Sequence, residues 1–107
     1  MVNSSVVNIS TKDDIMTAEL LGEIDHHTAR SMRESIDAAL VVSRPILLNL
    51  NFKNVKFMDS SGIGLIMGRF KLVSSLGGKL KVINIPKRFE RIIKLSGLGV
   101  LGVLEKV

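Results

Sequence analysis

Apolar and polar residues alternate near the start of the chain with the period of two that is typical of a strand with one buried face. Val7 and Ile9 are the apolar positions of a first stretch, and alternate residues of 16–20 are apolar in a second. Residues 12–14, between the two stretches, end in two aspartates, which favour turns. The pattern therefore predicts an N-terminal β-hairpin.

Over residues 28–42 the spacing of apolar residues changes to three and four, as in an amphipathic helix. The apolar stripe of this helix consists of Met32, Ile36, Ala39 and Leu40. Either Asp25 or Thr28 has a side chain that could cap its start. Arg44-Pro45 ends the helix, because proline disrupts a helix interior.

A short apolar run at residues 46–50 is of the kind found in strands buried on both faces. The polar pair Lys53-Asn54 follows it and predicts a connection. Beyond this connection, Val55 and Phe57 return the chain to the core.

Another apolar run at residues 80–85 predicts a further buried strand. Pro86 suits the first turn of a third helix, which ends at Gly97, and the residues up to Leu104 form either a short strand or a turn. A hairpin followed by alternating strands and helices predicts an α/β fold with a mixed sheet whose later strands are parallel. We expect one domain over residues 1–107, packed by three to four helices.

The second helix opens at residues 58–62, ends at Gly77-Gly78 and is unusually apolar. One face carries Ile63, Ile66, Met67, Phe70 and Val73, and another carries Leu65, Leu72 and Leu76. Such a helix is either buried on most sides or keeps part of its apolar surface for a partner. Gly64 and Gly68 could let it approach its neighbours closely. Each glycine costs up to about 1 kcal/mol relative to alanine in a helix interior, so some interaction must offset that loss.

Ser60 and Ser61 lie where a strand gives way to this helix, next to the unpaired backbone donors of the helix start. Their hydroxyls suit ordinary N-capping. A phosphate on either hydroxyl would also lie at the positive end of the helix dipole, where an anion is tolerated. We therefore expect phosphorylation here to leave the fold intact and to act on a partner.

The composition is that of a globular protein, with 46% hydrophobic and 23% charged residues. The chain has no cysteine, which excludes disulfides, thiolate nucleophiles and cysteine-ligated metals. Residues 1–10 lack the pattern of a signal peptide, and no apolar run approaches the roughly 20 residues needed to span a bilayer. We expect a cytoplasmic protein that does not bind a membrane.

The net charge of +5 is unevenly distributed along the chain. Residues 1–51 hold four Lys or Arg and seven Asp or Glu, whereas residues 52–107 hold eleven and three. A nucleic-acid surface could be formed by the basic residues of the third helix, Lys87, Arg88, Arg91 and Lys94. The chain has no Tyr or Trp to stack on bases, however, and its four Phe occupy predicted core positions. We therefore favour a solvated basic face that also suits an acidic protein partner, without direct nucleic-acid binding.

An enzyme is the other alternative. His26 or His27, together with Asp25 and Ser60, provides the residue types of a base, an orienting acid and a nucleophile in a small hydrolase. Ser60 is not in a Gly-x-Ser-x-Gly elbow, and nothing supplies an oxyanion site. Neighbouring helical histidines point in different directions and have no evident third ligand, so they make a poor metal site. We expect no catalytic residue, no metal and no cofactor.

Three segments carry a resemblance to a known family. They are residues 57–64 (Phe-Met-Asp-Ser-Ser-Gly-Ile-Gly), residues 22–29 (Gly-Glu-Ile-Asp-His-His-Thr-Ala) and residues 94–98 (Lys-Leu-Ser-Gly-Leu). Together they resemble the STAS-domain anti-sigma factor antagonists, and among these the sporulation type that controls sigma factor F. A general stress antagonist, or another STAS signalling module, is the nearest alternative.

This resemblance implies a STAS fold and a cycle of partner exchange. In that family the anti-sigma factor is a serine kinase, and it phosphorylates the serine directly after the aspartate of the Asp-Ser-Ser-Gly motif. In this chain the aspartate is Asp59 and the serine is Ser60. The unphosphorylated antagonist binds the kinase and displaces the sigma factor, and a PP2C-type phosphatase reverses the modification. The expected partner-binding surface consists of Asp25, Asp59, Ser61, Gly62 and Ile63. We expect the free protein to be a monomer.

Overall fold

A five-stranded mixed sheet runs through the computed structural model, which describes residues 2–3 and 6–105. Its strands lie in chain order: β1 (Val2–Asn3), β2 (Val7–Lys12), β3 (Ile15–Ile24), β4 (Leu47–Met58) and β5 (Lys79–Ile83). The pairs β1–β2 and β2–β3 are antiparallel, whereas β3–β4 and β4–β5 are parallel. The predicted domain, residues 1–107, also includes residues 1, 4–5 and 106–107, which lie outside the described residues.

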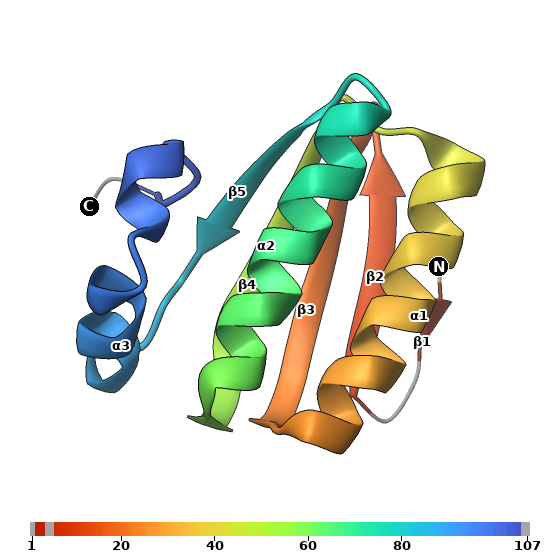
Figure 1. Ribbon diagram of the computed structural model, residues 1–107. Helices are drawn as coiled ribbons and strands as arrows, with labels where there is room; N and C mark the ends of the chain where they lie inside the picture. Colours follow the sequence, from red (N-terminus) through yellow and green to blue (C-terminus); the bar gives the residue numbers. More distant parts are fainter. Residues whose placement is uncertain (1, 4–5, 106–107) are drawn as a thin grey trace.

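Two long helices, α1 (His26–Ser43) and α2 (Ser60–Ser75), lie side by side on one face of the sheet (Figure 1). The short helix α3 (Glu90–Leu95) lies beyond β5, between the 3₁₀ turns Lys87–Phe89 and Leu98–Leu101. The predicted α/β class, the mixed sheet and the number of helices are confirmed. None of the helices in the described part of the chain combines the length and the apolarity needed to cross a membrane.

The last described residues form no regular strand. Leu104 makes an isolated parallel bridge to Val82, and Val82 also exchanges backbone hydrogen bonds with Val103 and Glu105. The last described residues therefore form a 3₁₀ turn followed by one bridge to β5, so the turn and not a regular strand is found up to Leu104.

The predicted N-terminal hairpin is confirmed. Lys12 pairs with Ile15, so only Asp13 and Asp14 form the turn. Both aspartates have positive φ angles, 53° and 64°, as a two-residue hairpin turn matched to the twist of the strands requires. Val7 and Ile9 are buried, as their alternation predicts.

Strand β4 differs most from the sequence prediction. It continues through Lys53-Asn54, so the connection predicted there is wrong. Burial on both faces is also wrong, because the helices cover one face of the sheet only. Asn54 therefore stays in the strand with its side chain on the open face, where its Nδ2 donates to Glu19 Oε2 at 2.9 Å.

One continuous core lies between the sheet and the two long helices. Its fully buried side chains from the sheet include Val7, Met16, Leu20, Ile24, Leu48, Leu50 and Phe52, and those from the helices include Met32, Ile36, Leu40 and Ile66. The stripe predicted for the first helix supplies three of these residues. Burial of such side chains contributes about 1.5–3 kcal/mol each, which fixes the helices on the sheet.

Candidate functional site

Two helices begin next to each other at one edge of the sheet. Because β3 and β4 are parallel, their carboxyl ends meet at this edge, where Ile24 pairs with Met58. The backbone N–H of Asp59 donates to the carbonyl oxygen of Ile24 at 3.2 Å. Asp25 and Asp59, the residues that follow the two strands, therefore place the starts of α1 and α2 side by side (Figure 1).

Asp25 caps α1. Its Oδ1 accepts from the backbone N–H groups of His27 and Thr28, both at 2.9 Å, and Thr28 Oγ1 accepts from the Asp25 N–H at 2.9 Å. This reciprocal capping box starts the helix two residues before the predicted start. The pKa of the Asp25 carboxyl is lowered, foremost by the N–H of Thr28 and further by the N–H and the charge of His27, while desolvation opposes the shift.

Asp59 caps α2, because its Oδ1 accepts from the backbone N–H of Ser61 at 2.7 Å. The prediction that Ser60 or Ser61 is the N-cap is therefore wrong. Ser60 is exposed in the first turn, and its hydroxyl makes no hydrogen bond to any residue of the described ranges. Ser61 is half-buried. Within the described ranges, the Ser60 hydroxyl is thus exposed and unbonded at a helix start that the Asp59 carboxylate already stabilises.

The next two residues of the expected partner-binding surface are Gly62 and Ile63, and only Gly62 is fully buried. Gly62 is buried, and a Cβ at this position would overlap the side chain of Met58. Ile63 is half-buried and packs against the core. Gly62 therefore lets α2 pack on the end of β4, whereas Asp25, Asp59, Ser61 and Ile63 are all half-buried neighbours of Ser60.

Phe57 is the residue of this site that sequence reasoning missed. It was predicted in the core, but 49% of its surface is exposed, two residues before the Asp59 cap. Buried positions in β4 change from every second residue to Phe52, Val55 and Met58, and the pairing of β3 with β4 shifts twice in this region. These β-bulges, which the alternation pattern does not reveal, turn Phe57 outward.

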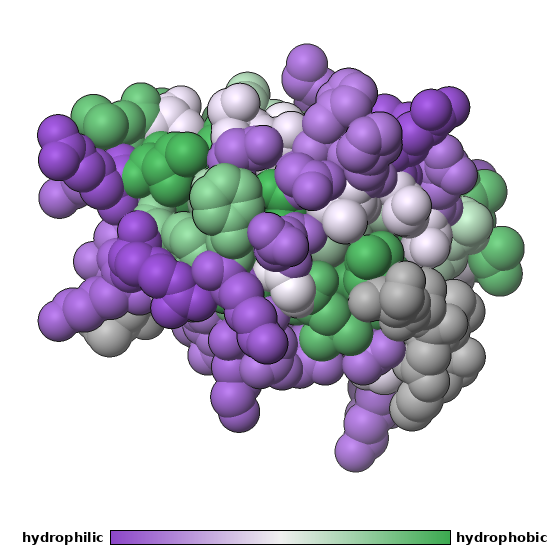
Figure 2. All heavy atoms as spheres, turned by 90° about the horizontal axis from the view of Figure 1, so that it is seen from below, coloured by the Kyte–Doolittle hydropathy of each residue, from purple (hydrophilic) through white to green (hydrophobic). Residues whose placement is uncertain are grey.

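Figure 2 shows this end of the molecule, where apolar side chains form a band across the face, flanked and partly interrupted by hydrophilic side chains. An apolar centre with a polar rim is the usual anatomy of a protein–protein interface. The exposed Ser60 and the exposed ring of Phe57 both belong to the segment that ends β4 and begins α2. The arrangement suits a protein partner that contacts the ring and senses the hydroxyl.

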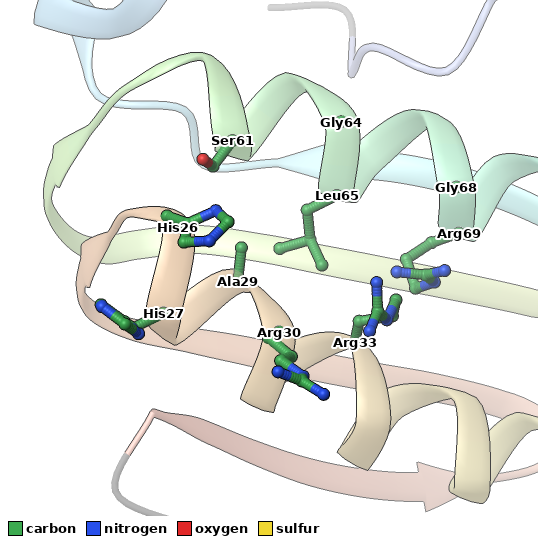
Figure 3. A pocket seen from close by; sticks show the side chains of 10 residues that line it. All are labelled: His26, His27, Ala29, Arg30, Arg33, Ser61, Gly64, Leu65, Gly68 and Arg69. Atoms are coloured by element: carbon green, nitrogen blue, oxygen red, sulfur yellow. The ribbon is translucent and has the colours of Figure 1, made fainter.

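A groove of about 550 Å³ separates α1 from α2 (Figure 3). Its lining consists of His26, His27, Ala29, Arg30 and Arg33 from α1 and Ser61, Gly64, Leu65, Gly68 and Arg69 from α2. Arg33 and Arg69 reach toward each other across the groove, whereas Ser61 and His26 lie near its open end. The groove therefore begins at the two helix starts and runs along both helices.

Arg69 is buried with only 6% of its surface exposed, and its Nε lies 2.7 Å from Oδ1 of Asp37, whose side chain is 32% exposed. The two atoms form no hydrogen bond within the described part of the chain, so the contact is an ion pair. Burial raises the pKa of Asp37, against the opposing effect of Arg69 and Arg33. Burial also lowers the pKa of Arg69, and the like charge of Arg33 lowers it further, while Asp37 opposes both.

The structure does not assemble the residues of the hydrolase alternative. The Asp25 carboxylate is engaged by backbone N–H groups, and among the described residues no hydrogen bond joins either imidazole to Asp25 or Ser60. The rings of His26 and His27 instead contact each other edge to face, with centroids 5.6 Å apart. Within residues 2–3 and 6–105, no cluster of three or more His, Asp or Glu side chains is placed to hold a metal ion.

Arg88, one of the basic residues considered for nucleic-acid contact, has a structural role. Its guanidinium donates to the carbonyl oxygen of Val55 at 2.9 Å and lies 4.8 Å from the centre of the Phe89 ring. These contacts fasten the start of the third helical segment to β4, so this guanidinium is already engaged within the fold.

Comparison with known proteins gives consistent matches. The model of the STAS domain family matches residues 6–103. An anti-sigma F factor antagonist from Paenibacillus polymyxa is 38% identical over 84 residues, 78% of this chain and 72% of that protein. An anti-sigma-B factor antagonist from Bacillus subtilis is 32% identical over 92 residues, 86% of this chain and 83% of that protein.

Two solved forms of the anti-sigma factor antagonist SpoIIAA share the fold. The unphosphorylated form superimposes with a TM-score of 0.82 at 26% identity, covering 95% of this chain and 88% of that protein. The phosphorylated form of SpoIIAA, described as a Bacillus cell fate determinant, gives a TM-score of 0.74 at 26% identity, over 95% of this chain and 91% of that protein.

Proposed function

The chain belongs to the STAS domain family of anti-sigma factor antagonists, and we propose that phosphorylation of Ser60 switches its binding to an anti-sigma factor. In this cycle the unphosphorylated protein binds an anti-sigma factor that is a serine kinase and thereby releases a sigma factor. The kinase then transfers a phosphoryl group from ATP to the Ser60 hydroxyl, which weakens binding. A PP2C-type phosphatase hydrolyses the phosphoserine and restores the binding form. The protein itself performs no catalysis and works in the cytoplasm.

One observation supports this role above the others: the Ser60 hydroxyl is exposed and unbonded within the described residues, while Asp59 caps the helix. A kinase can therefore reach the oxygen without opening the fold. A phosphoserine carries between one and two negative charges at neutral pH and lies at a helix N-terminus, where anions are stabilised. The new charge and bulk then act mainly on the partner.

The first test locates the modification. The protein is mixed with a candidate anti-sigma factor kinase and ATP, and the phosphate is mapped by mass spectrometry. We expect one phosphate, on Ser60. Ser61→Ala is the matched control and should still be phosphorylated, whereas Ser60→Ala should not. Equal phosphorylation of the Ser60→Ala variant would refute the assignment.

A second test separates the charge from the fold. Ser60→Asp should melt within a few degrees of the wild type, because Asp59 keeps the cap, but should bind the kinase at least about tenfold more weakly. The control is Ser60→Ala, which should bind as the wild type does. Normal binding by folded Ser60→Asp would remove the electrostatic explanation, and unfolding of this variant would show that the helix start does not tolerate an anion.

We infer a role in sporulation-specific transcription from the identity of 38% to the anti-sigma F factor antagonist of Paenibacillus polymyxa. The general stress response is the second candidate. Titration of the protein with an anti-sigma F factor and an anti-sigma-B factor from one host decides between them. Tighter binding of the anti-sigma F factor is expected, and preference for the other would assign the protein to the stress response.

A further inference from the structure

We propose that the groove between α1 and α2 binds an acidic segment of the anti-sigma factor, with Arg33 and Arg69 as the cations that receive it. The inference rests on the proposed function, because it assigns a second contact area to the same partner. The exposed serine and its neighbours form the first area, and the groove extends the contact along both helices.

The glycine wall of the groove is the first reason. Close approach of α2 to its neighbours was one of two interpretations of Gly64 and Gly68, but a Cβ at either position would meet nothing within 4 Å. That interpretation is wrong, and the space beside both residues is open. Each glycine still costs up to about 1 kcal/mol in a helix interior. Since no described residue occupies this space, an external chain that lies against the exposed backbone explains why both positions are glycine.

Charge is the second reason. Arg69 is paired with Asp37 at 2.7 Å, and Arg30 is paired with Glu34 at 3.3 Å. Arg33 has no ion pair with any described residue, so three guanidinium groups face two carboxylates and leave one positive charge. Arg33 and Arg69 also face each other, so an anion between them relieves repulsion between like charges (Figure 3).

Size and position identify the kind of ligand. A volume of about 550 Å³ lies within the range of roughly 300–1,000 Å³ that is usual for pockets holding drug-sized molecules, which is more than one carboxylate or phosphate fills. The groove opens at Ser61, directly after the proposed phosphorylation site. A protein docked on Ser60 therefore covers the mouth of the groove, and a chain segment with Asp or Glu side chains complements the charge inside.

The test measures binding of the full chain to its anti-sigma factor by titration calorimetry at low and physiological salt. Arg33→Glu should weaken binding about tenfold or more, with the larger loss at low salt. Lys12→Glu is the matched control, because it makes the same charge change at the exposed last residue of β2, outside the groove, and should alter affinity less than about twofold. Equal losses for the two variants would overturn the groove contact and reveal only an effect of net charge.

A second probe is independent of the proposed function. A hexaglutamate peptide, followed by amide chemical shifts, should perturb Gly64, Gly68 and Arg33 in the wild type and in Lys12→Glu, but not in Arg33→Glu. Absence of these shifts overturns the proposal. Equal shifts with inorganic phosphate also overturn it, because the groove would then be a site for small anions.

The two proposals fail in different ways. If the wild type does not bind the anti-sigma factor but the peptide still occupies the groove, the function is wrong and the groove is not. If the factor binds and Arg33→Glu binds equally well, the function stands and the groove assignment is wrong. Because Arg33 is exposed, its variants should keep the wild-type melting temperature, and Arg33→Gln provides a milder variant that should show an intermediate loss.

Discussion

Replacing glycine by alanine in α2 should stabilise the protein at Gly64 and Gly68 but destabilise it at Gly62, because the space around these residues differs. At Gly64 and Gly68 a Cβ meets nothing within 4 Å, so alanine adds helix propensity without a clash. The expected gain is about 0.5–1 kcal/mol per site, hence about 1–2 kcal/mol for the double variant. At roughly 4–8 °C per kcal/mol for a domain of this size, the double variant should melt about 4–16 °C above the wild type.

Gly62 is the matched control on the same helix. It is buried, and a Cβ there would overlap the side chain of Met58, which is itself 5% exposed. Overpacking costs about 1–3 kcal/mol, which exceeds the gain in propensity, so Gly62→Ala should lower the free energy of unfolding by about 1 kcal/mol. Thermal unfolding followed by circular dichroism measures all three variants. A double variant at Gly64 and Gly68 that melts at or below the wild-type temperature would refute the open groove.

Three further results are expected. Asp37→Ala should lower the free energy of unfolding in urea by about 2 kcal/mol, because it leaves buried Arg69 without a counter-charge. Arg69→Met should lower it by less than about 1 kcal/mol, because water can reach Asp37. Equal losses for the two variants would contradict this difference. The lowered pKa of Asp25 means that its contribution to stability is present above its ordinary value of 3.8 and is lost as pH falls through the folded-state value. Between pH 5 and about pH 3 the wild type should therefore lose more free energy of unfolding than Asp25→Asn. If the free energy of unfolding falls in parallel with pH for both proteins, the Asp25 carboxylate is not the cause of the loss. Phe57→Ala should change stability by about 1 kcal/mol or less, since the ring is 49% exposed, but should weaken binding of the anti-sigma factor about tenfold; unchanged affinity would remove the ring from the interface.

Local patterns in the sequence were sufficient for the hairpin and for both long helices. The two aspartates of the hairpin turn and the apolar stripe of the first helix act over a few residues, so their spacing reveals them. The pattern predicts too short a strand β4, because the polar pair Lys53-Asn54 indicates a loop if helices are assumed to cover both faces of the sheet. The polar pair is compatible with a strand because one face of the sheet is open, and coverage of a face is a tertiary property that a local window does not contain.

The candidate site was predicted in outline but not in its contacts. The segment around Ser60 was found by its place before an apolar helix, yet the cap is made by Asp59, because the side chain one residue earlier reaches the Ser61 N–H. The ion pair between Arg69 and Asp37 joins residues 32 positions apart, and the groove depends on how far α1 lies from α2. Distances between helices depend on the packing of the whole core, so no spacing along the chain predicts them.

The capping of α2 by Asp59 and not by Ser60 has a consequence for the resistance of the protein to proteases in a cell. Asp59 stabilises the start of the helix whether or not Ser60 is modified, so in the proposed cycle the phosphorylated and unphosphorylated forms should resist proteases equally well. In that proposed cycle the ratio of the two forms follows the activities of the kinase and the phosphatase alone, without degradation or resynthesis of the chain.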